Sequence, residues 1–139
     1  MTFARAGHTP LMYMPADGGA AGAQVLIPNG LVVGLRIPGA HQKFEELLEE
    51  HRVTLNAGDV LVFYTDGITE AMNHDNDLFG DARLSRLVEE HGHLDTADLR
   101  ERILREIEAF VGPADQHDDM TMILVKVDEA GAVVARVAV

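Results

Sequence analysis

The sequence predicts an α+β fold built as one domain. Apolar, β-branched runs lie in the first and last parts of the chain, and two amphipathic helical patterns lie together between them. The pattern lacks the regular alternation of strand and helix that would indicate a parallel sheet. The 139 residues, 47% hydrophobic and 24% charged, have the length and composition of a single globular domain.

Short strands are expected in the first third of the chain. Leu11–Met14 is an apolar run that ends at a glycine- and alanine-rich stretch, 17–23, typical of a loop. The runs 24–27 and 31–35 flank Pro-Asn-Gly at 28–30, which is a turn sequence. Together they predict a β-hairpin.

The segment that follows is ambiguous. Between 44 and 55 several glutamates favour helix and the final residues favour strand, so only a strand near Val53 is predicted. After a turn at 56–58, Val60–Tyr64 is a continuous apolar run of the kind found in a strand covered on both faces. This strand is expected to end at Thr-Asp-Gly, 65–67.

Two helices are predicted next. The first ends near Gly92, and the second begins with Thr96 as its N-cap and ends at Gly112. Because each helix has a single apolar stripe, both are expected to pack on the same side of the sheet. The stripes are Leu84, Leu87 and Val88 in the first helix, and Leu99, Ile103, Ile107 and Phe110 in the second.

The last part of the chain returns to strand. An acidic loop is expected at 115–119, followed by a buried strand over 122–127. The tail, 128–139, contains an apolar run at 133–139 that predicts one further strand.

Charge and composition exclude several classes of function. Eleven lysine and arginine residues against 23 aspartate and glutamate residues give a net charge of −12, so a nucleic-acid backbone would be repelled. Without cysteine, the chain has no disulfide, thiolate metal site or cysteine nucleophile. The sequence has no run of the ~18 apolar residues that a spanning helix needs. We therefore expect a cytoplasmic protein with no membrane segment and no nucleic-acid partner.

Acidic residues stand at the ends of two predicted strands. Asp66 directly follows the first doubly covered strand, and Gly67 allows a sharp turn beside it. Asp118 and Asp119 precede the last buried strand and would face Asp66 if the two strands were neighbours. Carboxylates are the ligands that Mg²⁺ and Mn²⁺ prefer. The alternative is a plain turn at Asp66 and a solvated acidic loop before the last strand.

Several motifs resemble those of a known family. Residues 64–71 (YTDGITEA) and 116–121 (QHDDMT) closely resemble the two late motifs of the SpoIIE and RsbU type of PPM (PP2C-like) protein serine/threonine phosphatases. Residues 6–10 (AGHTP), 55–61 (LNAGDVL) and 78–80 (LFG) match smaller family segments in the same order. The resemblance implies the PPM fold, a β-sandwich flanked by helices.

The resemblance also implies roles for single residues. Asp66 and Asp118 correspond to the two late aspartates that bind Mn²⁺ or Mg²⁺ in the family's dinuclear site. Asp119 is expected to support these ligands or stabilise the loop, with a simple solvated acid as the alternative. Gly67 is expected to serve backbone geometry, and His117 is expected to be structural rather than a general acid.

The chemistry implied by the resemblance is metal-assisted hydrolysis of a phosphoester. In the family, a water held between two metals attacks phosphorus in line, and no covalent phosphoenzyme forms. The metals also neutralise charge on the phosphoryl oxygens, so an acidic protein can handle an anionic substrate. The implied partner is a phosphoserine or phosphothreonine protein, such as an anti-sigma factor antagonist.

The sequence departs from the family pattern in its first half. The family's domain is longer and carries an early glycine-rich aspartate motif, GDVxGHG, that does not occur between residues 1 and 139. Because that aspartate bridges the two metals, this chain would keep ligands for one metal and lack the bridge. We expect 1–139 to form the carboxy-terminal portion of a single PPM domain without its first strands and helices, as a fragment, a misassigned gene start or a short paralogue. Uncovered strand edges would then favour self-association.

Three hypotheses of function follow. The chain is part of a metal-dependent serine/threonine phosphatase that is active only with its missing half. Alternatively, it is a catalytically inactive pseudophosphatase that binds phosphoproteins. A third possibility is a general cation-binding α+β domain that has inherited the fold without the chemistry.

Overall fold

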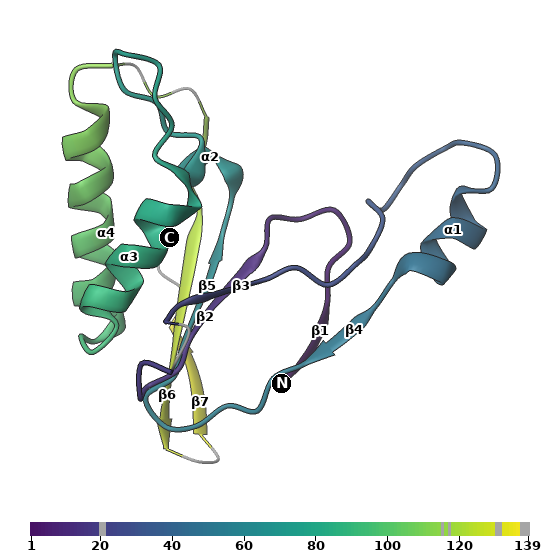
Figure 1. The fold of residues 1–139 in the computed structure, drawn as a ribbon, viewed down its shortest axis with the longest axis horizontal. Coiled ribbons are helices and arrows are strands. Elements are labelled where there is room, and N and C mark those ends of the chain that lie inside the picture. The colour runs from purple at the N-terminus through teal and green to yellow at the C-terminus, as the bar shows by residue number, and fades with distance from the viewer. Residues whose placement is uncertain (20–21, 115, 117, 130–131, 137–139) are drawn as a thin grey trace.

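The computed structural model describes residues 1–19, 22–114, 116, 118–129 and 132–136 (Figure 1). None of the helices in these residues is long and apolar enough to cross a membrane. The elements are, in order, β1 (Thr2–Ala4), β2 (Leu11–Met14), β3 (Gln24–Leu26), α1 (Ala40–Leu47), β4 (Glu50–Arg52), β5 (Val60–Tyr64), α2 (Asp66–Thr69), α3 (Gly80–His91), α4 (Thr96–Val111), β6 (Met122–Glu129) and β7 (Ala132–Arg136).

An antiparallel sheet of five strands forms the centre of the protein, in the order β3-β2-β5-β6-β7. The two buried strands expected from the sequence, β5 and β6, are neighbours, and their pairing ends with Tyr64 opposite Met122. β7 occupies part of the tail and pairs with β6, while residues 130, 131 and 137–139 of the tail lie outside the described residues. The expected mixture of helices with antiparallel strands is confirmed.

Both faces of the central sheet are apolar. Along β5, Val62 and Tyr64 belong to the core beneath the helices, whereas Leu61 belongs to a second cluster on the opposite face. The expectation that β5 is covered on both sides is therefore confirmed. The second cluster contains Leu11, Tyr13, Leu61 and Val125, with Phe3, Leu26, Val53, Leu55, Phe63 and Ile123 packed against it.

Helices α3 and α4 cover one face of the sheet, as predicted (Figure 1). They are followed by Gly92 and Gly112 respectively, also as predicted. The predicted N-cap of α4 is wrong by one residue, because Asp95 caps the helix and accepts a hydrogen bond from the Asp98 amide at 2.8 Å. Thr96 is already the first helical residue, while Asp95 keeps an extended backbone with φ −69° and ψ 167°.

Residues 27–52, together with β1, form an arm that projects away from the sheet (Figure 1). In this arm β1 pairs with β4 in a two-stranded antiparallel sheet, and α1 lies near the far end. The pairing continues one residue further, where the Val53 amide donates to the carbonyl of Met1 at 2.9 Å. The prediction of a strand near Val53 is confirmed. Of the glutamates before it, Glu45 and Glu46 lie in α1, whereas Glu49 follows the helix and Glu50 begins β4.

The predicted hairpin between 24–27 and 31–35 is wrong. β3 pairs with β2 instead, and residues 31–35 form no strand. Pro28 has no backbone donor to continue the ladder. The next carbonyl, of Asn29, accepts from the Glu49 amide within the arm at 3.0 Å, so the chain leaves the sheet at this point.

Candidate metal centre

The ends of β5 and β6 carry the acidic residues that the sequence singles out. Asp66 lies two residues beyond Tyr64 and begins the short helix α2. Asp118 and Asp119 lie in the irregular segment that leads into β6. Because the two strands are paired up to Tyr64 and Met122, both segments emerge at the same end of the sheet.

Gly67 allows these segments to approach closely. A Cβ atom at this position would collide with the carbonyl oxygen of Asp119 and would lie 3.5 Å from the carbonyl carbon of Asp118. The glycine is required by this close approach, since it lies in the first turn of α2 rather than at a positive φ. The backbone of the Asp118–Asp119 segment therefore packs directly on the turn that carries Asp66.

The carboxylates of Asp66 and Asp118 are exposed and keep acceptor capacity. One oxygen of Asp66 accepts from the Gly67 amide at 3.1 Å, and one oxygen of Asp118 accepts from the Asp119 amide at 2.7 Å. Among the described side chains, no lysine or arginine forms an ion pair with either carboxylate. The second oxygen of each is thus available to a cation or to water.

This set of donors fits part of a site for a hard divalent cation. Mg²⁺ and Mn²⁺ are commonly bound by one or two carboxylates, with water completing an octahedral shell. The described part of the chain contains no group of three or more histidine, aspartate or glutamate side chains that could hold a metal. The chain offers two carboxylates, and further ligands would be waters, main-chain carbonyls or groups from another segment.

A hollow of about 350 Å³ opens beside Asp118, with Gly67, Glu70 and Met120 among the residues that line it. The Glu70 and Asp119 side chains are exposed, and Asp119 contributes to the local structure through its main-chain carbonyl. The expected role of Asp119 in supporting the metal ligands stays a prediction.

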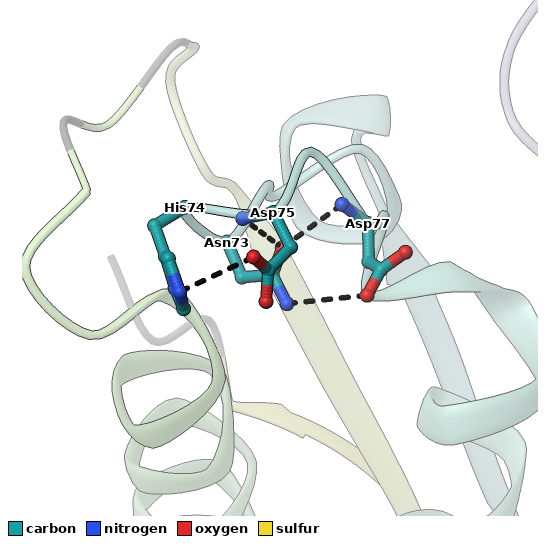
Figure 2. A network of polar contacts seen from close by, with 4 residues as sticks. All are labelled: Asn73, His74, Asp75 and Asp77. Carbon is teal, nitrogen blue, oxygen red and sulfur yellow. Dashed lines mark hydrogen bonds and ion pairs between the residues drawn. The ribbon is translucent and has the colours of Figure 1, made fainter.

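The loop between α2 and α3 is also acidic, but its polar groups bond with one another (Figure 2). The side-chain oxygen of Asn73 accepts from the amides of Asp75 and Asp77 at 3.0 and 2.9 Å. Asp75 lies 3.3 Å from His74, and Asp77 accepts from the Asn73 side chain at 3.4 Å. This arrangement is typical of a loop that stabilises its own turn.

The AGHTP segment, 6–10, reaches the same end of the sheet. The Thr9 hydroxyl donates to the main-chain carbonyl of Tyr64 and lies 2.8 Å from Nδ1 of His8. The Tyr64 hydroxyl in turn donates to Asp81 at 2.6 Å. Burial of the ring, followed by the bond to Asp81, raises the pKa of Tyr64 well above its usual value, so the residue stays neutral. Tyr64 thus connects the end of β5 to both the first segment and α3.

Thr65 is the residue at this centre that sequence reasoning misses. Its hydroxyl donates to the carbonyl of Asp119 at 3.2 Å and accepts from the Thr121 amide at 3.0 Å. A hydroxyl residue at a strand end, directly before Asp-Gly, is the sequence signal that could have identified it. His117 lies outside the described residues, and its expected structural role stays a prediction.

Comparison with known families identifies the family of this chain. The sequence model of the family described as "Stage II sporulation protein E (SpoIIE)" matches residues 1–128. The chain belongs to the SpoIIE family. This confirms the resemblance drawn from the motifs at 64–71 and 116–121.

The proteins that this chain resembles are longer than the chain itself. Phosphoserine phosphatase RsbU of Bacillus subtilis is 28% identical over 128 residues, which are 90% of this chain and 34% of RsbU. The SiaA-PP2C domain of Pseudomonas aeruginosa has a TM-score of 0.71 at 20% identity, covering 91% of this chain and 46% of that one. The phosphatase domain of SpoIIE from Bacillus subtilis, presoaked with Mn, has a TM-score of 0.62 at 22% identity, with coverages of 94% and 52%. The fold is thus that of part of a PP2C domain, and the chain spans about half the length of these solved chains.

Proposed function

We propose that this SpoIIE-family chain supplies the carboxy-terminal portion of a metal-dependent protein serine/threonine phosphatase, with Asp66 and Asp118 as ligands for Mn²⁺ or Mg²⁺. The observation that carries the proposal is the apposition of the two aspartate segments at the paired ends of β5 and β6. Exposed carboxylates on a rigid sheet edge can hold a cation without rearrangement of the core.

Each residue of the centre has a distinct part in this proposal. Asp66 and Asp118 would each direct one carboxylate oxygen to the metal, while the other oxygen is held by the following amide. Gly67 keeps the two segments close enough to share a cation. When bound, the metal would offset negative charge on a phosphoryl group and lower the pKa of a coordinated water. Without it, the two carboxylates would repel a phosphate.

We infer that the substrate is a phosphoserine or phosphothreonine on a bacterial regulator, such as an anti-sigma factor antagonist. The name of the relative RsbU, a phosphoserine phosphatase, supports this class of substrate. We also infer that the domain works in the cytoplasm, together with a regulator of this kind.

A binding function without hydrolysis is the second candidate. The described residues offer two carboxylates and no group of three or more metal-holding side chains, which is fewer than a dinuclear site needs. In this alternative the chain is a pseudophosphatase that recognises a phosphoprotein. A general cation-binding domain would instead bind metals weakly and without selectivity.

Hydrolysis of an aryl phosphate by the purified chain tests the proposal. Rates are measured with and without millimolar Mn²⁺ for the wild type, for Asp66→Asn and for Asp128→Asn, whose exposed carboxylate lies at the far end of β6. Mn²⁺-dependent activity that Asp66→Asn removes and Asp128→Asn keeps would support the phosphatase. A folded but inactive wild type that still binds Mn²⁺ through Asp66 would fit both a phosphatase portion that needs the rest of its domain and a pseudophosphatase. Metal binding unaffected by Asp66→Asn would contradict the assignment of Asp66 as a metal ligand.

A further inference from the structure

The residue between β5 and α2 has two structural tasks at once. The Thr65 amide donates to the carbonyl of Thr121 at 3.0 Å and so adds one more bond to the β5–β6 ladder. The Thr65 carbonyl accepts from the Ile68 amide at 3.1 Å and so begins the turn of α2. Its main-chain carbonyl is therefore used by the helix and is not the partner of the Thr121 amide across the sheet.

The hydroxyl of Thr65 takes the place that its carbonyl would have had in a continuing antiparallel ladder. It accepts from the Thr121 amide at 3.0 Å and donates to the carbonyl of Asp119 at 3.2 Å. A threonine at this N-cap position usually bonds to an amide of its own helix, but Thr65 makes no such side-chain bond. Both hydroxyl contacts are made to the segment that carries Asp118 and Asp119.

The geometry points to Thr65 as a positioning residue for the metal centre: its hydroxyl fixes the Asp118–Asp119 backbone against the turn that carries Asp66. This inference rests on the proposed function, because it concerns the two carboxylates assigned to the metal. Gly67 allows the two segments to pack closely, and the hydrogen bond from Thr65 to Asp119 fixes their relative position. Two carboxylates on separate segments bind one cation well only if their relative position is fixed beforehand.

The two hydrogen bonds of the Thr65 hydroxyl are exposed to solvent. Their loss should therefore affect the position of the metal ligands more than the stability of the fold. Asp119 and Thr121 are exposed, so water can replace a lost partner of either main-chain group. Replacing Thr65 by valine keeps the shape and removes the hydroxyl. We expect the melting temperature to change little, while the affinity for Mn²⁺ falls about 10-fold or more, as for other residues that orient metal ligands.

The test uses the full chain and three matched variants. Thr65→Val removes the hydroxyl, Thr65→Ser restores it, and Thr54→Val makes the same change at an exposed site in another part of the chain. Mn²⁺ alone is titrated and the free ion is followed by electron paramagnetic resonance, with Asp66→Asn as the variant that lacks a proposed ligand. Exchange of the Thr121 amide is measured by NMR in the same samples, with the Val125 amide of β6 as an internal reference.

The expected result is weak Mn²⁺ binding and fast Thr121 exchange in Thr65→Val, recovery to within about threefold of the wild-type affinity in Thr65→Ser, and no change in Thr54→Val. Wild-type affinity in Thr65→Val, with binding that still depends on Asp66, would overturn the positioning role and leave the proposed metal centre intact. Wild-type binding that Asp66→Asn does not alter would overturn the proposed function and this inference with it. Equal losses in Thr65→Val and Thr65→Ser would show that the methyl group and its packing matter, and would also overturn the role of the hydroxyl.

Discussion

The helix-covered side of the sheet and the arm differ in how their apolar residues are used. On α3 and α4, Leu84, Val88 and Ile103 are fully buried in the core. In the arm, large apolar side chains are exposed over a short stretch. These are Ile27, Val32, Val33, Leu35, Ile37, Leu47 and Leu48, with exposed fractions from 36 to 68%.

The two regions differ in how completely their apolar residues are buried. On the helix side, sheet and helices bury one another, so the apolar stripes are fully used. The arm is held by local polar contacts: Asn29 donates to Glu49 at 2.9 Å, and Arg5 donates to the carbonyl of Pro28 at 3.3 Å. The bond from Asn29 lowers the pKa of Glu49 below its usual value. Exposed apolar residues in this number are typical of surfaces that contact other protein segments.

The largest expected effect is the difference in stability between the same substitution in the core and in the arm. Leu84→Ala in α3 should lower the free energy of unfolding by about 2–5 kcal/mol, because it leaves a cavity in a closed core. Leu47→Ala in α1 makes the same change at a side chain that is 45% exposed, and should stay within about 0.5 kcal/mol. Urea unfolding followed by circular dichroism measures both. Similar losses for the two variants would mean that the arm is packed as tightly as the core.

The next effect concerns the sheet face opposite the helices, close to the base of the arm. Asp59 is 1% exposed and accepts from the Tyr13 hydroxyl and from the Ala16 and Asn56 amides at 2.8 to 2.9 Å. In Asp59→Asn one acceptor becomes an NH₂ group that faces donors, which should destabilise the protein by about 1–3 kcal/mol. The same urea experiment measures this loss, and Asp17→Asn, at an exposed position, is the control. A loss no greater than that of the control would show that the carboxylate is not needed at the start of β5.

Much of the helix side could be predicted from the sequence. The apolar run of β5 and the helical stripes of α3 and α4 each depend on residues that are close in sequence, and local periodicity reports such patterns. The prediction of a strand over 31–35 is wrong because it also rested on a local pattern alone. Its β-branched residues favour a strand, but among the residues that the structure describes no strand pairs with them. Pairing is decided by contacts distant in sequence.

The candidate site was predictable only in part. Asp66 and Asp118 follow from motifs and from their places at strand ends, yet nothing local in the sequence shows that β5 and β6 pair. The close approach at Gly67 and the two hydroxyl bonds of Thr65 exist only because of that pairing. Sequence patterns identify residues that carry chemistry more readily than residues that position them.

A smaller effect on stability is expected at alkaline pH, on the sheet face opposite the helices, where Tyr13 bonds to Asp59. Burial of Tyr13, then its bond to Asp59, raises the pKa of its hydroxyl to about 12. In the unfolded chain the tyrosine loses this proton near its ordinary pKa of 10.0. The contribution of Tyr13 to the free energy of unfolding is therefore fully present below pH 10 and is lost as the pH rises toward 12. The slope for one proton cannot exceed about 1.4 kcal/mol per pH unit, and solvent screening reduces it.

Tyr13→Phe provides the comparison for this pH dependence. Urea unfolding of the wild type between pH 9 and 11.5 should show a steeper decline than that of Tyr13→Phe, since the variant has no proton to lose at this position. Parallel declines in the two proteins would assign the alkaline loss to other groups.

The smallest effect on stability is expected in the arm, where a different property should change. Val33 and Ile37 are 68 and 59% exposed, so replacing both by aspartate removes little buried surface and should alter stability by less than about 0.5 kcal/mol. If the exposed apolar residues drive self-association, sedimentation velocity at rising concentration should show growing mass for the wild type and a constant 15.1 kDa for the double variant. A control with Ala82→Asp and Ala109→Asp, exposed positions on α3 and α4, adds the same charge to the helix side and should behave like the wild type. Association that persists in the arm variant would move the contact surface to the edges of the sheet, because unpaired strand edges also recruit a second copy.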